Sequence, residues 1–171
     1  YIGKQKASPI LLAGLAKLEY RGYDSAGVAI IDNNQIKVVK DKGRVENLAS
    51  LVKKEDLEGT VGIAHTRWAT HGIPSKINSH PHMDNSKNFA VVHNGIIENY
   101  VELKNFLKEN GYHFISDTDT EIIPNLISYF YKNDSKNNDG KLLRAVHKTC
   151  EKLIGSFALE ILCKYEPDKI I

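Results

Sequence analysis

The sequence has little of what marks several large classes of protein. It has only two cysteines, Cys150 and Cys163, which are too few for a disulfide framework. Free thiols together with seven histidines fit a reducing, cytoplasmic setting. No apolar run approaches the roughly 18 residues of a membrane span, and no signal-peptide pattern opens the chain. Acids and bases are interleaved at a formal net charge of +2, so neither nucleic acid nor a membrane is an expected partner.

Several motifs of known chemistry are also missing. The chain has no phosphate loop, no glycine-rich dinucleotide fingerprint and no G-x-S-x-G nucleophile elbow. Cys150 falls on the apolar face of a predicted helix and Cys163 ends an apolar strand, whereas reactive thiols need a polar, positive setting. The sequence therefore offers no clear nucleophile, and we expect no cofactor.

Apolar segments follow one another regularly along the 171 residues, a length that fits one compact domain. Their spacing predicts strands at 26–31, 36–39, 60–68, 89–93 and 156–163, and helices at 8–18, 44–54, 99–110, 118–132 and 143–153. The first two strands form a predicted hairpin. Strands occur in adjacent pairs, and helices do too, which favours an α+β fold with antiparallel sheets over a doubly wound fold.

Two of the predicted helices begin with the spacing of a capping box. Asn99 stands three residues before Glu102, and Thr118 stands three residues before Glu121. In both cases we expect the first residue to cap the helix that follows.

Both ends of the chain suggest a fragment. The chain opens on Tyr1 without a methionine, and residues 169–171 are typical of a strand that is just beginning. A domain that stops within a strand would leave backbone groups unpaired, so we expect truncation at both ends.

Four polar clusters lie at the ends of predicted strands or at the starts of predicted helices, where functional sites are usually built. They are EYRGYDSAG (19–27), HTRWATHG (65–72), HNGIIENY (93–100) and SDTDTE (116–121).

Each cluster allows a structural and a functional interpretation. Arg67 can fork onto a substrate carboxylate, or it can be a surface arginine paired with a nearby acid. Trp68, the only tryptophan, belongs either to the core or rim or to a lid. Arg21 and Asp24 can simply pair with each other.

The third and fourth clusters also allow two interpretations each. Asn94-Gly95 is the strongest short signal of a hairpin, but the same pair can present an amide and a backbone N–H to one point, as an oxyanion hole does. Asp119 is either a helix cap or the partner of a substrate ammonium group.

The histidines raise the question of a metal. His80 and His82 flank a proline, and His93 follows a predicted strand. A tetrahedral site needs three or four ligands in a fixed shell, and no cysteine lies near these residues. We therefore expect no metal.

Taken together, the clusters resemble the glutaminase domains of the glutamine–fructose-6-phosphate aminotransferase family, which are class II glutamine amidotransferases. The segments EYRGYDSAG, HTRWATHG, HPH, VVHNGIIENY and TDTE match that family in order, across nearly the whole chain. The resemblance implies an N-terminal-nucleophile hydrolase fold, a four-layer αββα sandwich of two antiparallel sheets. It also implies that residues 1–171 are a single type 2 amidotransferase domain without the sugar isomerase domains.

The resemblance further implies an activity. The family splits glutamine into glutamate and ammonia, and a second domain uses the ammonia to convert fructose-6-phosphate into glucosamine-6-phosphate. The reaction begins at an N-terminal cysteine in Cys-Gly-Ile-Val-Gly, just before the stretch that here starts at Tyr1. Without that cysteine the chain is expected to bind glutamine at best. Alternatives are a non-catalytic glutamine-binding relative and an amidotransferase with another acceptor. For the full-length protein the resemblance implies a homodimer.

Residue roles carried over from the family concern both ends of glutamine. Asn94 and the backbone N–H of Gly95 match the oxyanion hole. Arg67 matches the partner of the glutamine α-carboxylate, and Asp119 matches the acceptor of the α-ammonium group.

Five further residues match the surroundings of the family's site. Trp68 matches the gate of the ammonia path, and Thr70 and His71 match the pocket lining in the loop that closes over glutamine. Arg21 and His80 match positions that support the site.

Overall fold

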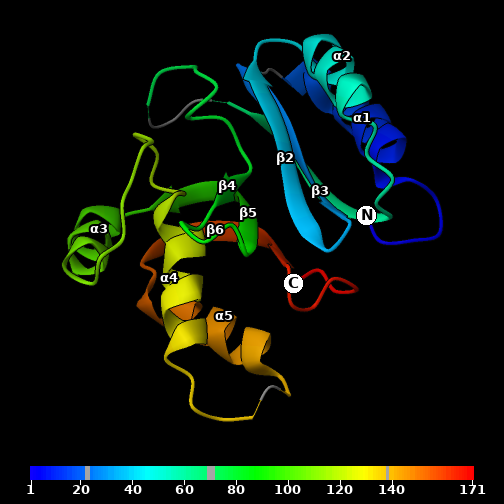
Figure 1. Ribbon diagram of the computed structural model, residues 1–171. Coiled ribbons are helices and arrows are strands. Elements are labelled where there is room, and N and C mark those ends of the chain that lie inside the picture. Colours follow the sequence, from blue (N-terminus) through cyan, green and yellow to red (C-terminus); the bar gives the residue numbers. More distant parts are fainter. Residues whose placement is uncertain (22–23, 69–71, 138) are drawn as a thin grey trace.

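Two stacked antiparallel sheets organise the fold in the computed structural model, which describes residues 1–21, 24–68, 72–137 and 139–171 (Figure 1). Within these ranges the strand orders are β2-β1-β3 and β4-β5-β6. Helices cover the outer faces of both sheets. The predicted α+β sandwich with four layers is therefore confirmed.

The first sheet consists of β1 (Ser25–Asp32), β2 (Gln35–Lys42) and β3 (Val61–Arg67). The predicted hairpin between β1 and β2 is confirmed, since Asn33 and Asn34 both have positive φ, at 49° and 59°, as a tight hairpin turn requires. Every residue of β1 is buried, because this central strand is covered on both faces. Ser25 pairs with Arg67, which fixes Arg67 at the end of the sheet.

The second sheet consists of β4 (His82–Met83), β5 (Phe89–Ile97) and β6 (Gly155–Cys163). Strand β5 runs four residues past its predicted end, and Asn94 pairs with Ala158. The hairpin interpretation of Asn94-Gly95 is therefore wrong. Gly95 has φ +132°, and a Cβ there would lie 2.0 Å from the Ser156 carbonyl oxygen, so the glycine permits close strand pairing rather than a turn.

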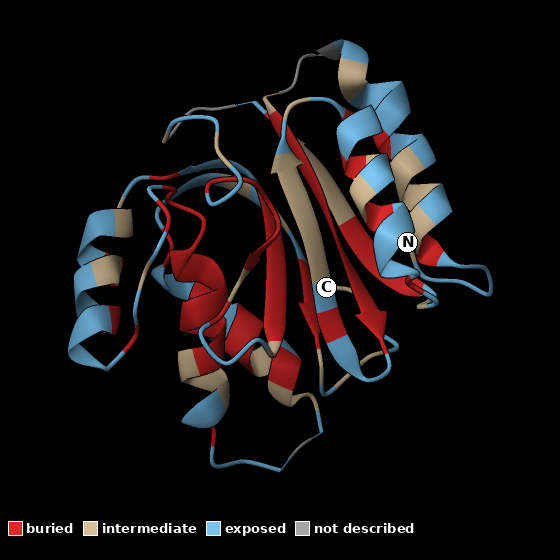
Figure 2. Cartoon of the chain, turned by 45° about the horizontal axis from the view of Figure 1, so that its top comes forward, coloured by how far each residue is buried: buried red, intermediate tan, exposed pale blue. Residues whose placement is uncertain are grey.

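Helices form the outer layers, and their inward faces are buried while their outward faces are exposed (Figure 2). They are α1 (Ala7–Leu18) with the short 3-10 helix Glu19–Arg21, α2 (Val45–Glu55), α3 (Tyr100–Glu109), α4 (Ile122–Lys132) and α5 (Lys141–Lys152). Helices α1 and α2 pack on the first sheet, and α4 and α5 pack on the second. No helix in the described part of the chain is long and apolar enough to cross a membrane.

An apolar layer joins the two sheets to each other. Ala29 and Ile63 of the first sheet meet Ala90, Val92 and Leu162 of the second in one buried cluster. This contact sets the ends of β3 and β5 beside each other, and described residues of the polar clusters, among them Asp24, Arg67, Asn94 and Asp119, lie around those ends.

Neither predicted capping box forms. The Asn99 side chain donates to the Lys152 carbonyl at 2.9 Å and accepts the Ile154 N–H at 2.9 Å, which ties the start of α3 to the loop before β6. Glu121 accepts the N–H and the hydroxyl of Ser116, both at 2.7 Å. Thr118 lies with its hydroxyl 3.2 Å from Nε2 of His82. The two predicted capping side chains, Asn99 and Thr118, therefore have partners that are distant in the sequence.

Adjacent leucines of α5 offer a matched test of the packing, because Leu142 is 1% exposed and Leu143 is 62% exposed. We expect Leu142→Ala to lower the free energy of unfolding by about 2–5 kcal/mol, since a buried cavity is created. Leu143→Ala should change it by less than about 0.5 kcal/mol. Urea unfolding of both variants measures the difference, and similar losses would contradict this packing of α5.

Candidate active site

A cleft of about 590 Å³ opens where the ends of β3 and β5 meet the loop before α4. The residues that line it come from distant parts of the sequence. They are Leu15, Leu18, Ala64, His65, Thr66, Arg67, Trp68, His80, His93, Asn94, Gly95, Ile96, Thr118, Asp119 and Thr120. The cleft therefore brings three of the four polar clusters into one site.

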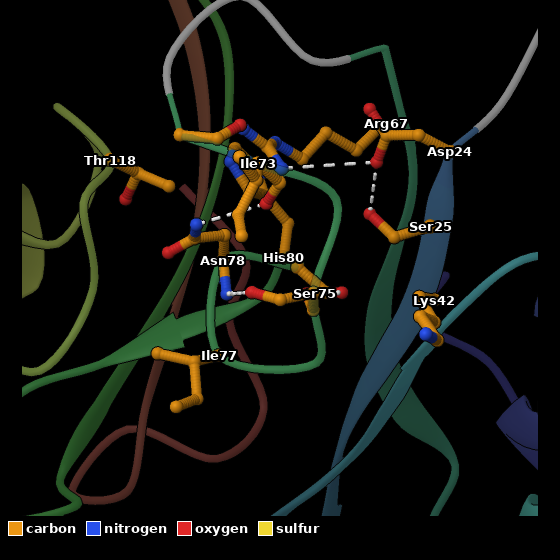
Figure 3. Close-up of polar contacts among 12 residues, drawn as sticks. Asp24, Ser25, Lys42, Arg67, Ile73, Ser75, Ile77, Asn78, His80 and Thr118 are labelled. Carbon is orange, nitrogen blue, oxygen red and sulfur yellow. Dashed lines mark hydrogen bonds and ion pairs between the residues drawn. The ribbon is translucent and has the colours of Figure 1, made fainter.

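Arg67 is a buried cation in the wall of this cleft, only 4% exposed. Its Nη2 donates to the Gly72 carbonyl at 3.1 Å, and its Nη1 lies 3.8 Å from Oδ1 of Asp24 (Figure 3). The same Asp24 oxygen accepts the Ser25 hydroxyl at 2.6 Å. The interpretation of Arg67 as a surface arginine is therefore wrong, although its pairing with a nearby acid is present.

Asp119 is a buried carboxylate in the lining of the same cleft, 4% exposed. Its Oδ2 accepts the Ile97 N–H at 2.8 Å, at the end of β5. Among the described residues no ion pair within 4.0 Å involves Asp119, and the Thr120 hydroxyl also donates to its Oδ1 at 3.5 Å. A buried carboxylate with spare acceptor capacity suits an ammonium group.

Asn94 and Gly95 form part of the cleft from within β5, and both are exposed. Trp68 lies just after β3, lines the cleft and is 70% exposed. The interpretation of Trp68 as a core residue is therefore wrong, and its place is at the rim.

Asn78 joins two loops that border the cleft. Its Nδ2 donates to the Ile73 carbonyl at 3.0 Å, and its backbone N–H donates to the Ser75 hydroxyl at 3.2 Å (Figure 3). Its Oδ1 accepts the Asp117 N–H at 3.0 Å, two residues before Asp119. This buried amide therefore fixes the loop near Arg67 against the loop that carries Asp119.

Histidines form the floor of the cleft in a hydrogen-bonded order. The His93 N–H donates to Nδ1 of His80 at 3.3 Å, so that nitrogen carries no proton. Neutral His80 then donates from Nε2 to the Thr120 hydroxyl at 3.2 Å. The same oxygen lies 2.9 Å from Nδ1 of His93, and the hydroxyl donates to Oδ1 of Asp119 at 3.5 Å. Thr120 thus links two imidazoles to the carboxylate of Asp119.

Burial keeps these imidazoles neutral. It lowers the pKa of His65 to about 4, with smaller contributions from His93 and Arg67. Burial likewise holds the pKa values of His80 and His82 well below 6.5, and neighbouring cationic groups add to the effect. His65 stacks on His80 with ring centroids 4.5 Å apart, and its Nδ1 has no hydrogen-bond partner among the described residues.

Metal and thiol chemistry find little support in these groups. No set of three or more His, Cys, Asp or Glu side chains in the described ranges is arranged to hold a metal ion. Burial raises the pKa of Cys163 to about 11, and it also raises the pKa of Cys150. Neither thiol lines the cleft.

Comparison with known families identifies the fold around this cleft. A family described as a glutamine amidotransferase domain matches residues 65–170, more than half of the chain. The chain belongs to this family.

Relatives with high identity carry one shared name. The chain is 54% identical over 171 residues to the glutamine–fructose-6-phosphate aminotransferase (isomerizing) of Clostridium perfringens. It is 55% identical over 171 residues to the enzyme of the same name from Caldanaerobacter subterraneus. Each match covers 100% of this chain but only 27% of the relative.

Solved structures share the fold. Glutamine phosphoribosylpyrophosphate amidotransferase from B. subtilis superposes with a TM-score of 0.76 at 24% identity, over 95% of this chain and 34% of that one. A glutamine aminotransferase class-II domain protein from Silicibacter pomeroyi superposes with a TM-score of 0.52 at 16% identity, over 82% of this chain and 65% of that one. Both likenesses concern the fold alone.

Within this amidotransferase domain, most of the predicted site residues meet. Arg67, Trp68, His80, Asp119 and the Asn94-Gly95 pair all line the cleft. Thr70, His71 and the side chain of Arg21 lie outside the described residues.

Several polar residues of the cleft received no site role in the sequence analysis, among them His65, Thr118 and Thr120. His65 opens the HTRWATHG segment, and Thr118 and Thr120 belong to the TDTE segment, in which only Asp119 was predicted to contact the substrate. The alternation of hydroxyl and carboxylate in TDTE was the available signal.

The neutral histidines make the stability of the amidotransferase domain depend on pH. Between about pH 6.5 and pH 4 the unfolded chain binds protons that His65, His80 and His82 in the folded state do not bind. The free energy of unfolding should therefore fall as the pH drops through this range. Urea unfolding across it measures the slope, which should be shallower in His65→Gln and unchanged in His113→Gln, at an exposed position. Equal slopes in all three proteins would contradict this account.

Proposed function

We propose that this domain hydrolyses glutamine to glutamate and ammonia, as the glutaminase part of a glutamine–fructose-6-phosphate aminotransferase. One observation carries the proposal: a single cleft holds a buried cation, a buried anion and an exposed amide, from Arg67, Asp119 and Asn94. The shared name of relatives above 50% identity supports the same function. The ammonia would pass to a second domain that converts fructose-6-phosphate into glucosamine-6-phosphate.

The two buried charges would select a free amino acid. Arg67 would bind the α-carboxylate through its fork, beside the Gly72 carbonyl that it already contacts. Asp119 would accept from the α-ammonium group, and its bond to the Ile97 N–H holds it in place. A glutamine side chain within a peptide lacks both charges, so neither buried group would gain a charged partner from the ligand.

At the other end of the substrate, Asn94 and the Gly95 N–H would stabilise the oxyanion. The side chain of Asn94 is exposed to the cleft, and the strand pairing of β5 with β6 holds its backbone. Rigid donors of this kind act on charge that develops in the transition state, without reorganising as it appears.

The nucleophile would come from a segment upstream of Tyr1. The Tyr1 amino group donates to the Gly62 carbonyl at 2.8 Å, the Gly62 N–H donates back at 2.9 Å, and Ile2 pairs with Val61. Antiparallel continuation of this pairing would run along β3, so a residue about five positions before Tyr1 would lie opposite Arg67. That is the position of the family's N-terminal cysteine.

The chemistry then takes two steps. The cysteine thiolate would attack the side-chain amide carbon of glutamine, forming a γ-glutamyl thioester and releasing ammonia. Its own α-amino group, with a pKa near about 7.7–8.0, would take the thiol proton and deliver it to the leaving nitrogen. Water would then hydrolyse the thioester to glutamate.

The remaining predicted residues would support substrate binding and ammonia transfer. Trp68 would gate the ammonia path from the rim, and His80 would support the floor. Thr70 and His71 would line the closing loop, and Arg21 would support it. The cytoplasmic location and the homodimer stay predictions.

Glutamine hydrolysis by the full-length protein tests the proposed function. Glutamate release should require the N-terminal cysteine, and Asn94→Ala should lower kcat by roughly 10²–10³ with little change in KM. Asn105→Ala, at an exposed position of α3, is the control and should change neither. Glutamine binding without glutamate release would instead favour the non-catalytic alternative, and a rise in KM equal to the loss in kcat would argue against the oxyanion role.

Arg67→Lys should weaken glutamine binding by about 10-fold or more, because a point charge cannot replace the guanidinium fork. Calorimetry on protein whose N-terminal cysteine is replaced by alanine measures the affinity. The matched ligand is 4-aminobutanamide, which is glutamine without its α-carboxylate. Its affinity should be the same in both proteins, and an equal loss for both ligands would show that Arg67 does not contact the carboxylate.

A further inference from the structure

Lys40 on β2 binds three backbone carbonyls of one loop. Its Nζ donates to the carbonyl oxygens of Ser79 at 2.6 Å, Pro81 at 2.9 Å and Ile77 at 3.4 Å. The described residues give Lys40 no carboxylate within ion-pair distance. A partly buried ammonium held by carbonyls alone is unusual, because charged lysines at such positions normally have an acidic partner.

The strand partner of Lys40 is a glycine, which allows this loop to pack against the sheet. Gly27 lies directly opposite Lys40 in the pairing of β1 with β2. A Cβ at Gly27 would lie 2.1 Å from the His80 carbonyl oxygen and 2.6 Å from Cβ of Lys40. The missing side chain lets the loop approach the sheet, and the ammonium then holds its carbonyls there.

The loop that Lys40 holds carries residues that line or border the cleft. It contains His80, whose ring lies in the floor, and Asn78, which contacts the Ile73 carbonyl and the Asp117 N–H. Gly72, whose carbonyl accepts from Arg67, packs so closely on Asn78 that a Cβ at Gly72 would lie 2.7 Å from Nδ2. Figure 3 shows Asn78, Ile73 and His80 gathered beside Arg67. Displacement of residues 77–81 would therefore shift both His80 in the floor of the cleft and the contacts that position Arg67.

Keeping Lys40 protonated in the folded state lowers the free energy of unfolding. Burial lowers its pKa from 10.5 to about 8, nearby Arg67 and Lys76 lower it further, and Glu121 opposes them. Buried His82 also faces it and stays neutral. Because the folded-state pKa lies below the unfolded value, protonated Lys40 disfavours folding below about pH 8, and this penalty fades as the pH rises toward 10.5. A residue that opposes folding in this way is better explained by geometry than by stability.

We propose that Lys40 is a positioning residue for the glutamine site: its ammonium group fixes the carbonyls of residues 77–81 and thereby holds His80, and Arg67 through Gly72, in binding geometry. The inference rests on the proposed function. Lys40 itself does not line the cleft, so it acts only through the loop.

The test compares Lys40→Met with Lys42→Met in the full-length protein. Lys42 lies two residues along the same strand, is exposed, and loses the same charge. Lys40→Met should raise KM for glutamine between about 10-fold and 100-fold with a smaller loss in kcat, because displaced binding groups weaken the substrate complex. Its melting temperature should not fall. A KM within about twofold of Lys42→Met, or a parallel loss of kcat and melting temperature, would overturn the proposal.

Lys40→Arg provides a second test that does not require the charge to be lost. In the unmodified protein the KM for glutamine should rise as the pH increases through about 8, where Lys40 loses its proton. The same profile in Lys42→Met corrects for titration of glutamine and of the nucleophile. Arginine stays charged, so Lys40→Arg should lack the step near pH 8. Retention of the step in Lys40→Arg would overturn the proposal.

Hydrogen exchange separates this proposal from the proposed function. If the unmodified protein releases no glutamate from glutamine, the proposed function fails. The placement of the loop can still be measured, because Lys40→Met should increase amide exchange in residues 77–82 and leave that of α5 unchanged. Unchanged exchange in residues 77–82 would overturn the role of Lys40 whatever the activity.

Discussion

The apolar contact between the two sheets determines where every group of the cleft can lie. Ala29 and Ile63 on one sheet and Val92 on the other belong to the buried cluster that packs the two sheets against each other. Because side chains alternate along a strand, a slip of β5 by one residue would turn Asn94 away from the cleft and bring His93 or Gly95 to its position. The site is therefore a consequence of packing between strands that are far apart in the sequence.

Charge in the cleft is restricted to its walls. The imidazoles of His65, His80 and His82 are buried and kept neutral, so the floor is polar without being cationic. Arg67 and Asp119 are then the opposed charges of the lining, and burial weakens the screening between them and a bound ligand. Such an arrangement suits a zwitterion better than an anion or a cation alone.

Local patterns predicted most helices and strands but not which partner every polar side chain contacts. The helix and strand periods located α1, the β1–β2 hairpin and β3 closely. They failed where a distant partner competed with a local one. The Thr118 hydroxyl contacts His82 instead of capping a helix, and Gly95 allows the close approach of Ser156 instead of forming a turn. A propensity rule describes neighbours in sequence, and these choices depend on neighbours in space.

The sequence by itself determined the α+β class and the amidotransferase family, and it predicted Arg67, Asn94 and Asp119, which line the cleft, because motifs such as HTRWATHG and TDTE are contiguous. Only the tertiary structure decided that Arg67 is buried beside Asp24, that Thr120 contacts two imidazoles, and that Lys40 holds the loop of His80. The physical reason is that hydrogen bonds, burial and the resulting pKa values depend on contacts between segments tens of residues apart. No local pattern in Lys40 or Thr120 records which carbonyl or ring the folded chain brings to it.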